Sequence, residues 1–222
     1  MLITKILLGT AVLTFAFCAS LFAWLYLPAG KNRSIHEYST MQLAAEGQTG
    51  LPGTWTSELV SPGYIPLGHK GSMRLVFEQD SASTGSDLWV NTSAPYNIVV
   101  EARAEIPSAG TIPSGQLTRV LEPGRPVEFV WQISPQSEGT LDGRVWLYLR
   151  YIPRNGGTSL DKPLSVHPLS IRSVTLFGRT ADQVKLLALM AFALGAVLAL
   201  PYIILRSRQA QNRDHLPDNP TG

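Results

Sequence analysis

Cysteine and charge are both scarce in this chain of 222 residues. Cys18 is the single cysteine, and charged residues make up 15% of the sequence. One cysteine excludes an internal disulfide and a zinc site built from thiolates, so a hydrophobic core has to stabilise any folded domain. The formal net charge is only +2, and no basic face alternates with aromatic residues. We therefore expect no nucleic-acid partner.

Sequence patterns of catalysis and metal binding are missing as well. The four histidines, His36, His69, His167 and His215, are scattered, and none accompanies a G-x-S-x-G motif. The chain has no H-x-x-x-H pair, no acidic calcium loop and no glycine-rich phosphate loop. Two carboxylates for sugar cleavage can come from distant strands, so spacing leaves that reaction open. We expect a protein without enzymatic activity, metal or cofactor.

Apolar sequence is plentiful, and its first long run covers residues 6–27 without one charged side chain. At ~1.5 Å per helical residue, this run can cross a hydrocarbon layer of ~30 Å. Trp24 and Tyr26 lie at its far end, where amphipathic rings mark a membrane boundary. The alternative is a cleaved signal peptide that begins at Lys5 and ends near residues 18–20. A signal core is usually about 7 to 15 residues long, so we favour a transmembrane helix.

A second uncharged run covers residues 186–205 and predicts another transmembrane helix, which Pro201 would kink or end locally. Ala191, Gly195 and Ala199 recur every fourth position and therefore share one helix face. We interpret them as a helix-packing stripe for the first helix or for another membrane subunit. Plain lipid-compatible filler is the alternative. Small residues of the first helix also invite close packing: Ala16, Ala19, Ser20 and Ala23.

Basic residues outside the two runs predict the orientation. Lys5 precedes the first run, and Arg206, Arg208 and Arg213 follow the second. Cationic flanks favour the cytoplasmic side, so we expect both termini there and the middle of the chain outside. Basic residues on the opposite flanks weaken this assignment: Lys31, Arg33, Arg179 and Lys185. The predicted layout has a cytoplasmic start at 1–5, a linker at 178–185 and a disordered cytoplasmic tail at 206–222.

The middle of the chain predicts a connector followed by a β domain. Residues 28–53 are polar and read as a juxtamembrane connector, with a helical turn or two within 34–45. From residue 54 to residue 177, apolar side chains recur with period two, which indicates strands with one buried face. The clearest strands are 97–106 and 127–133. Further strands are predicted at 55–59, 73–79, 88–91, 117–122, 144–152 and 164–176.

Many short strands between proline and glycine turns, without intervening helices, indicate an all-β antiparallel sandwich of two sheets. Within 117–152 the chain reads Pro-Gly-Arg-Pro-Val-Glu-Phe-Val-Trp-Gln-Ile-Ser-Pro, then Glu-Gly, then RVWLYLRYI. This stretch resembles the later strands of immunoglobulin-like or fibronectin-type extracytoplasmic modules. The cysteine pair of true immunoglobulin domains is absent here. The resemblance implies a scaffold used mostly for binding and assembly, and it implies no particular ligand.

The strand at 144–152 is apolar on both faces. One face belongs to the core, and the other carries Arg144, Trp146, Tyr148 and Arg150. This second face is either covered by the protein itself or forms a contact surface for a partner. Tryptophan, tyrosine and arginine are the residues enriched in binding hot spots. The four residues are therefore our candidate partner surface.

Together these patterns predict a two-pass integral membrane protein whose extracytoplasmic β-sandwich binds or positions a protein partner. An accessory subunit of a membrane complex fits this prediction. Its partners would be the lipid bilayer and another membrane or extracytoplasmic protein, and a homo-oligomer remains open. One alternative is a transmembrane ligand-sensing module, although little sequence lies outside the two runs to carry an output. A second alternative is an enzyme with an unrecognised site on the sandwich loops.

Overall fold

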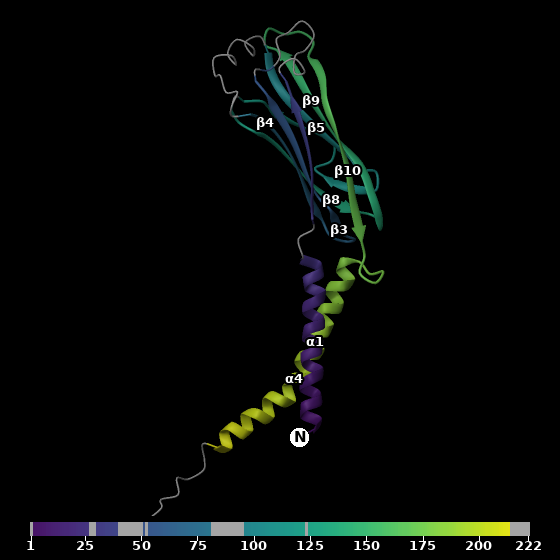
Figure 1. The fold of residues 1–222 in the computed structure, drawn as a ribbon, viewed down its shortest axis with the longest axis vertical. Coiled ribbons are helices and arrows are strands. Elements are labelled where there is room, and N and C mark those ends of the chain that lie inside the picture. The colour runs from purple at the N-terminus through teal and green to yellow at the C-terminus, as the bar shows by residue number, and fades with distance from the viewer. Residues whose placement is uncertain are drawn as a thin grey trace, which may run out of the picture. The chain divides into compact units, whose positions relative to one another are not determined.

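The computed structural model describes residues 2–26, 30–39, 51, 53–80, 96–122 and 124–213. The chain divides into a helical unit, residues 1–28 and 176–222, and a β unit, residues 29–175. The predicted strand at 88–91, the second half of the predicted helical turns at 34–45 and the end of the predicted tail lie outside the described residues. Figure 1 shows both units as a ribbon.

The described residues of the β unit form two five-stranded sheets (Figure 1). In sheet A the strands lie in the order β1 (Lys31–Tyr38), β2 (Trp55–Pro62), β4 (Gly71–Gln79), β8 (Val127–Pro135) and β6 (Ala109–Ile112). In sheet B the order is β3 (Tyr64–Pro66), β10 (Leu160–Val174), β9 (Gly139–Pro153), β5 (Tyr96–Glu105) and β7 (Gln116–Val120). The predicted two-sheet architecture is confirmed.

One strand pair departs from the predicted antiparallel arrangement, because β3 runs parallel to β10. The chain leaves sheet A at the end of β2 and enters sheet B as β3, with Gly63 at the crossing. The amide of Gly63 donates to the carbonyl of Gly30, and a Cβ on Gly63 would lie 2.8 Å from that oxygen. Only glycine fits this crossing. The neighbours β2-β4-β8 and β10-β9-β5 reproduce the A-B-E and G-F-C neighbours of an immunoglobulin sandwich.

Alternation along the strands builds the core between the sheets. In β8 every second side chain from Val127 to Ile133 is buried, and in β9 the same holds from Val145 to Tyr151. The predicted strand at 97–106 likewise buries Ile98, Val100, Ala102 and Ala104. Trp55 and Phe77 stack in this core with their ring centroids 4.9 Å apart. The hydrophobic core that a cysteine-poor chain requires is therefore shared by both sheets.

The predicted connector at 28–53 is wrong at its start. Residues 31–38 form β1, which pairs with β2 along its whole length, from Lys31 opposite Pro62 to Tyr38 opposite Trp55. Residues 34–38 are therefore strand and not helical turns. The inward side chains of β1 are polar, so the strand lacks the apolar alternation that marks the others. Backbone pairing and polar contacts hold it instead.

The helical unit contains α1 (Leu2–Tyr26) and α4 (Ala181–Arg213). Helix α4 begins five residues before the predicted boundary. The prediction follows the uncharged run alone, whereas the first turns of the helix carry Asp182 and Lys185, which form an ion pair at 3.2 Å. The Gln183 side chain accepts from the Thr180 amide at 3.1 Å and thereby caps the helix start. The helix also continues past Pro201 to Arg213, so the predicted disordered tail is wrong for residues 206–213.

Gly143 offers a test of sheet packing. A Cβ at this position would lie 2.6 Å from the backbone oxygen of Glu105, whereas a Cβ at Gly110 would meet its nearest atom at 4.0 Å. We predict that Gly143→Ala lowers the free energy of unfolding by about 1–3 kcal/mol, because the backbone of β5 has to move. Gly110→Ala is the matched control and should change it by less than about 0.5 kcal/mol. Urea unfolding followed by tryptophan fluorescence measures both, and equal effects would contradict the packing argument.

Candidate functional site

The candidate partner surface from the sequence lies on the outer face of β9. Arg144 is exposed, whereas Trp146, Tyr148 and Arg150 are half-buried between the flanking strands β5 and β10. The Trp146 and Tyr148 rings stack with centroids 6.3 Å apart and an angle of 15° between their planes. The indole N–H of Trp146 donates to Glu105 Oε2 at 3.0 Å. The structure thus places all four residues on one face and fixes the orientation of the aromatic pair.

Arg150 has a structural role on this face. Its guanidinium binds Asp161 of β10 through two hydrogen bonds, at 2.6 and 3.1 Å, and reaches Glu101 of β5 at 2.8 Å. The hydrogen bonds with Asp161 raise the pKa of Arg150, and those with Arg150 lower the pKa of Asp161. The Glu101 side chain is only 4% exposed, and Gln116 also donates to it. Arg150 therefore neutralises a buried carboxylate, which makes it costly to remove.

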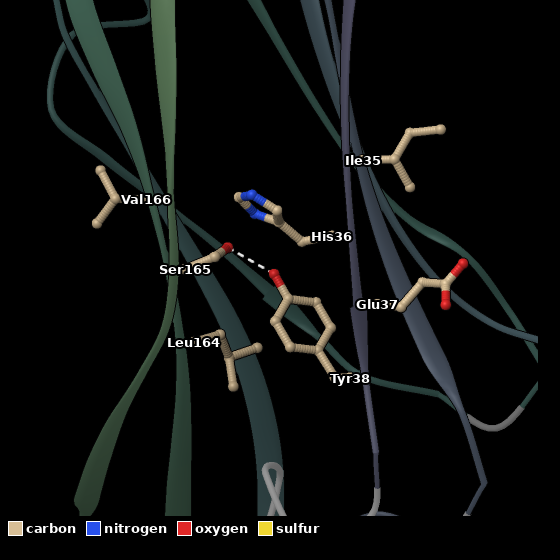
Figure 2. A pocket seen from close by; sticks show the side chains of 7 residues that line it. All are labelled: Ile35, His36, Glu37, Tyr38, Leu164, Ser165 and Val166. Atoms are coloured by element: carbon tan, nitrogen blue, oxygen red, sulfur yellow. Dashed lines mark hydrogen bonds between the residues drawn. The ribbon is translucent and has the colours of Figure 1, made fainter.

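A groove that the sequence did not indicate lies between β1 and β10, where sheets A and B face one another (Figure 2). Its volume is about 910 Å³, and its lining comes from residues 35–38 of β1 and 164–166 of β10. Figure 2 shows the side chains of His36 and Tyr38 pointing toward β10, whereas Ile35 and Glu37 point away from it. The acidic and imidazole groups of this lining therefore do not converge.

Polar side chains, some of which line the groove, join the two sheets, and we call them the polar seam. The seam consists of Asn32, Ser34, His36 and Tyr38 of β1, Ser57 of β2, and Ser165 and His167 of β10. His36 and His167 stack with their ring centroids 4.3 Å apart. The amide of Asn32 donates to the Ser170 carbonyl at 3.1 Å, and the Tyr38 hydroxyl donates to Ser165 Oγ at 2.6 Å. Three positions along β1 are thus bonded across to β10, since Ser34 contacts His167 at 3.2 Å.

One set of proton positions satisfies the centre of the seam. With neutral His167 protonated on Nε2, this nitrogen donates to Ser57 Oγ at 2.8 Å and Nδ1 accepts from the Ser34 hydroxyl. Ser57 then donates to the Tyr38 oxygen at 2.8 Å. Burial raises the pKa of Tyr38, against the smaller effect of its two serine bonds. Every proton of this hydrogen-bond network is already shared between fully or partly buried groups. The network therefore favours a structural role over acid–base chemistry.

The histidines of the seam do not form a metal site with other ligands. Within the residues that the structure describes, no group of three or more His, Cys, Asp or Glu side chains could hold a metal ion. His36 Nδ1 is buried without a hydrogen-bond partner there. The signal for the seam is present in the sequence as the alternation Asn32, Ser34, His36, Tyr38. Because those side chains are polar, a search for apolar alternation passes over it.

The stripe predicted on the second helix faces α1. Gly195 is buried, and a Cβ there would lie 3.4 Å from the Phe15 ring. Ala191 packs against the helix-pair cluster, and Cys18 Sγ donates to the Ala188 carbonyl at 3.2 Å. Ala199 is half-buried. The small residues of α1 are different, because its contact face carries larger side chains and the following positions are exposed: Ala16, Ala19, Ser20 and Ala23.

No protein-family model matches the chain, and no curated protein sequence matches it. Among solved structures, the chain is similar to the ASH / PapD-like domain 7 of human CEP192, with 11% identity over 51% of this chain and 78% of that one, at a TM-score of 0.28. It is also similar to AggA, the major subunit of aggregative adherence fimbriae type I from Escherichia coli, with 11% identity over 67% of this chain and 98% of that one, at a TM-score of 0.20. TM-scores this low carry no functional inference, so the arguments below rest on the chain's own residues.

The polar seam predicts acid sensitivity. Burial, with a smaller effect of His36, lowers the pKa of His167 from 6.5 to about 4. Between these pH values the unfolded chain binds a proton that the folded chain does not. Stability is therefore fully present above pH 6.5 and falls as the pH approaches 4, by up to about 3 kcal/mol.

Urea unfolding between pH 7 and pH 4.5 measures this slope. His167→Asn should be less stable than the parent at pH 7, because it loses the contacts of the ring. Its stability should nevertheless vary less between pH 6.5 and 4.5 than that of the parent. An unchanged slope would show that His167 is not responsible.

The helix pair can be tested at Gly195. We predict that Gly195→Leu separates α1 from α4, because the added side chain would collide with the Phe15 ring. Oxidative cross-linking of Cys18 to a cysteine placed at Ala188 reports the contact, and its rate should fall about tenfold or more, on the order of a 1.4 kcal/mol loss of contact free energy. Gly9→Leu is the matched control, since a Cβ at Gly9 meets nothing within 4 Å. Equal rates in both variants would refute this packing.

Proposed function

We propose that this chain is a two-helix membrane protein without enzymatic activity, whose β-sandwich binds or positions a protein partner through the outer face of β9. An accessory subunit of a membrane complex is the role that fits best. The observation that carries the proposal is the stacked pair of Trp146 and Tyr148, half-buried, fixed by Glu105 and flanked by exposed Arg144.

The rigidity of this face supports binding. Both aromatic side chains are already held in place before any partner arrives, so a complex loses little side-chain entropy when it forms. Arg150 joins the neighbouring strands through Asp161 and Glu101, and this network holds the side chains of the face in place. Half-exposed aromatic rings beside an exposed arginine are also typical of hot-spot composition. The other outer face, on sheet A, offers an ion pair of Arg74 with Glu128 at 2.8 Å around the exposed Val130.

The apolar surface of the helices supports anchoring in a membrane. Helix α1 holds a candidate span at Leu8–Tyr26, and α4 holds one at Ala181–Ile204. The sides of these helices that do not touch one another carry large apolar residues that are more than half exposed, among them Leu13, Phe17, Leu189 and Val197. Exposed apolar surface on this scale needs lipid or another membrane protein to cover it.

Site-specific photo-cross-linking in native membranes tests the proposal. A photoreactive phenylalanine analogue replaces Tyr148, and in a matched control it replaces Val130 on the outer face of sheet A, which is 43% exposed. We expect irradiation to yield a discrete adduct with another protein at position 148 and none at position 130. Arg150 is left intact, because its loss would disturb the folding of the domain.

Two outcomes would contradict the proposal. Equal yields at positions 148 and 130 would show that the β9 face is not preferred. An adduct at position 148 that contains only two copies of this chain would replace the proposed partner with a homo-oligomer. Antibody detection of an epitope tag and mass spectrometry of the adduct distinguish these outcomes.

The groove between β1 and β10 favours a second function, ligand sensing. Its lining combines the apolar side chain of Leu164 with the polar groups of His36, Tyr38 and Ser165. A small amphipathic molecule would suit such a lining. A molecule bound there would contact β1 of sheet A and β10 of sheet B, and β1 directly follows α1 in the chain. A groove variant, His36→Trp, should abolish binding of such a molecule while leaving the adduct at position 148 unchanged, because His36 points toward β10 and lies on sheet A.

A further inference from the structure

A tight turn ahead of α4 presents a phenylalanine to the surroundings. The amide of Leu176 donates to the Arg179 carbonyl at 3.1 Å, and the amide of Arg179 donates to the Leu176 carbonyl at 3.0 Å. Between them, Phe177 and Gly178 have φ angles of 53° and 71°. Two central residues with positive φ form a turn of type I′, which favours asparagine and glycine.

Neither the backbone conformation nor the packing of the turn explains why residue 177 is a phenylalanine. A bulky side chain in the left-handed region is an outlier that costs conformational energy. The Phe177 side chain is also 88% exposed, the highest value among the exposed large apolar residues of the described chain. Phenylalanine at this position therefore gains nothing from the folded protein alone. An apolar environment outside the chain would supply the missing stabilisation.

The helix pair fixes where this turn lies. Leu176 packs against the cluster formed by Leu25 of α1 with Ala181 and Val184 of α4. Trp24 packs against the same cluster, and Tyr26, two residues on, is 67% exposed. The Phe177 turn thus belongs to the end of the helix pair at which α1 stops and α4 starts. Three aromatic residues lie at this end: Trp24, Tyr26 and Phe177.

The charge pattern places the same end at a membrane boundary. The uncharged run of α4 starts at Leu186, directly after Lys185, which pairs with Asp182. At ~1.5 Å per residue, the start of α4 lies about 8 Å before this run, which matches the headgroup layer on one side of a bilayer. Figure 1 shows the segment between β10 and α4 projecting sideways from the first turn of α4. A side chain on this segment can therefore enter the layer from beside the helix.

We propose that Phe177 inserts into the lipid headgroup layer and, with Trp24 and Tyr26, sets the depth of the helix pair in the bilayer. This inference rests on the proposed membrane anchoring and adds a lipid-binding turn outside both helices. The turn acts as a wedge: its two hydrogen bonds hold the backbone rigid, and Leu176 ties it to the helices. Arg179, which is exposed beside Phe177, lies close to the lipid phosphates.

Spin labelling of the full chain in phosphatidylcholine vesicles tests the depth of residue 177. Cys18→Ser removes the native thiol and keeps a donor for the Ala188 carbonyl. Single cysteines then carry a nitroxide at Phe177, at Leu189 on the exposed side of α4, or at Asn155 in the turn after β9. Collision rates with oxygen and with a water-soluble nickel chelate measure the depth of each label. We expect the ratio of oxygen to nickel collisions at 177 to exceed that at Asn155 at least fivefold and to stay below that at Leu189.

The three labels separate the two possible failures. A ratio at 177 equal to that at Asn155, with Leu189 in lipid, would overturn the wedge and leave the membrane anchoring intact. A water-exposed Leu189 would overturn the anchoring and the wedge with it.

Two further variants keep the result independent of the label. Phe177→Trp retains an aromatic ring, and its added fluorescence should be quenched by phosphatidylcholine brominated high in the acyl chain. The absence of quenching would contradict insertion. Phe177→Asn suits the positive φ, so it should leave the thermal midpoint in detergent unchanged or raise it. A lower midpoint together with the absence of quenching would show that Phe177 serves the fold and not the lipid.

Discussion

Burial of the inner row of β9 is the constraint on which the β domain depends. Val145, Leu147 and Leu149 are fully buried against sheet A, and β9 pairs with β5 on one side and β10 on the other. Because side chains alternate along a strand, burying this row forces Trp146, Tyr148 and Arg150 onto the opposite face. The register of the pairs then sets their neighbours, so that Glu101 and Glu105 meet them from β5. The candidate partner surface is thus a consequence of how the core is packed.

The strands that could be predicted from sequence are those whose buried rows are apolar. Residues 97–106 and 127–133 alternate clearly, and the structure contains β5 and β8 at those positions. Strand β1 escaped prediction because its inner row is Ser34, His36 and Tyr38, which reads as polar connector. Strand β3 has three residues and β6 has four, and such short segments contain too few side chains for a period to be visible.

The candidate sites differ in the same way. Arg144, Trp146, Tyr148 and Arg150 share one strand, so their common face follows from period two alone. The polar seam joins residues more than one hundred positions apart, such as Ser57 and His167. Only the sheet topology brings them together, and no local pattern encodes that pairing. The helix stripe is intermediate, because its face on α4 follows from the period of 3.6 residues but its contact with Phe15 requires the partner helix.

The polar seam also has a mechanical meaning. The start of β1 and the end of β10 lie at the same end of the sandwich, where Asn32 binds the Ser170 carbonyl. In the chain, β1 follows α1 and β10 precedes α4. A force that draws the two helices apart would therefore enter the domain at one end and act on opposite sheets. It would load the cross-sheet contacts one after another, first that of Asn32, then that of Ser34 and finally that of Tyr38. Contacts loaded one at a time yield at low force, so the sandwich would resist separation of the two helices only weakly at this edge, while the apolar core stays closed.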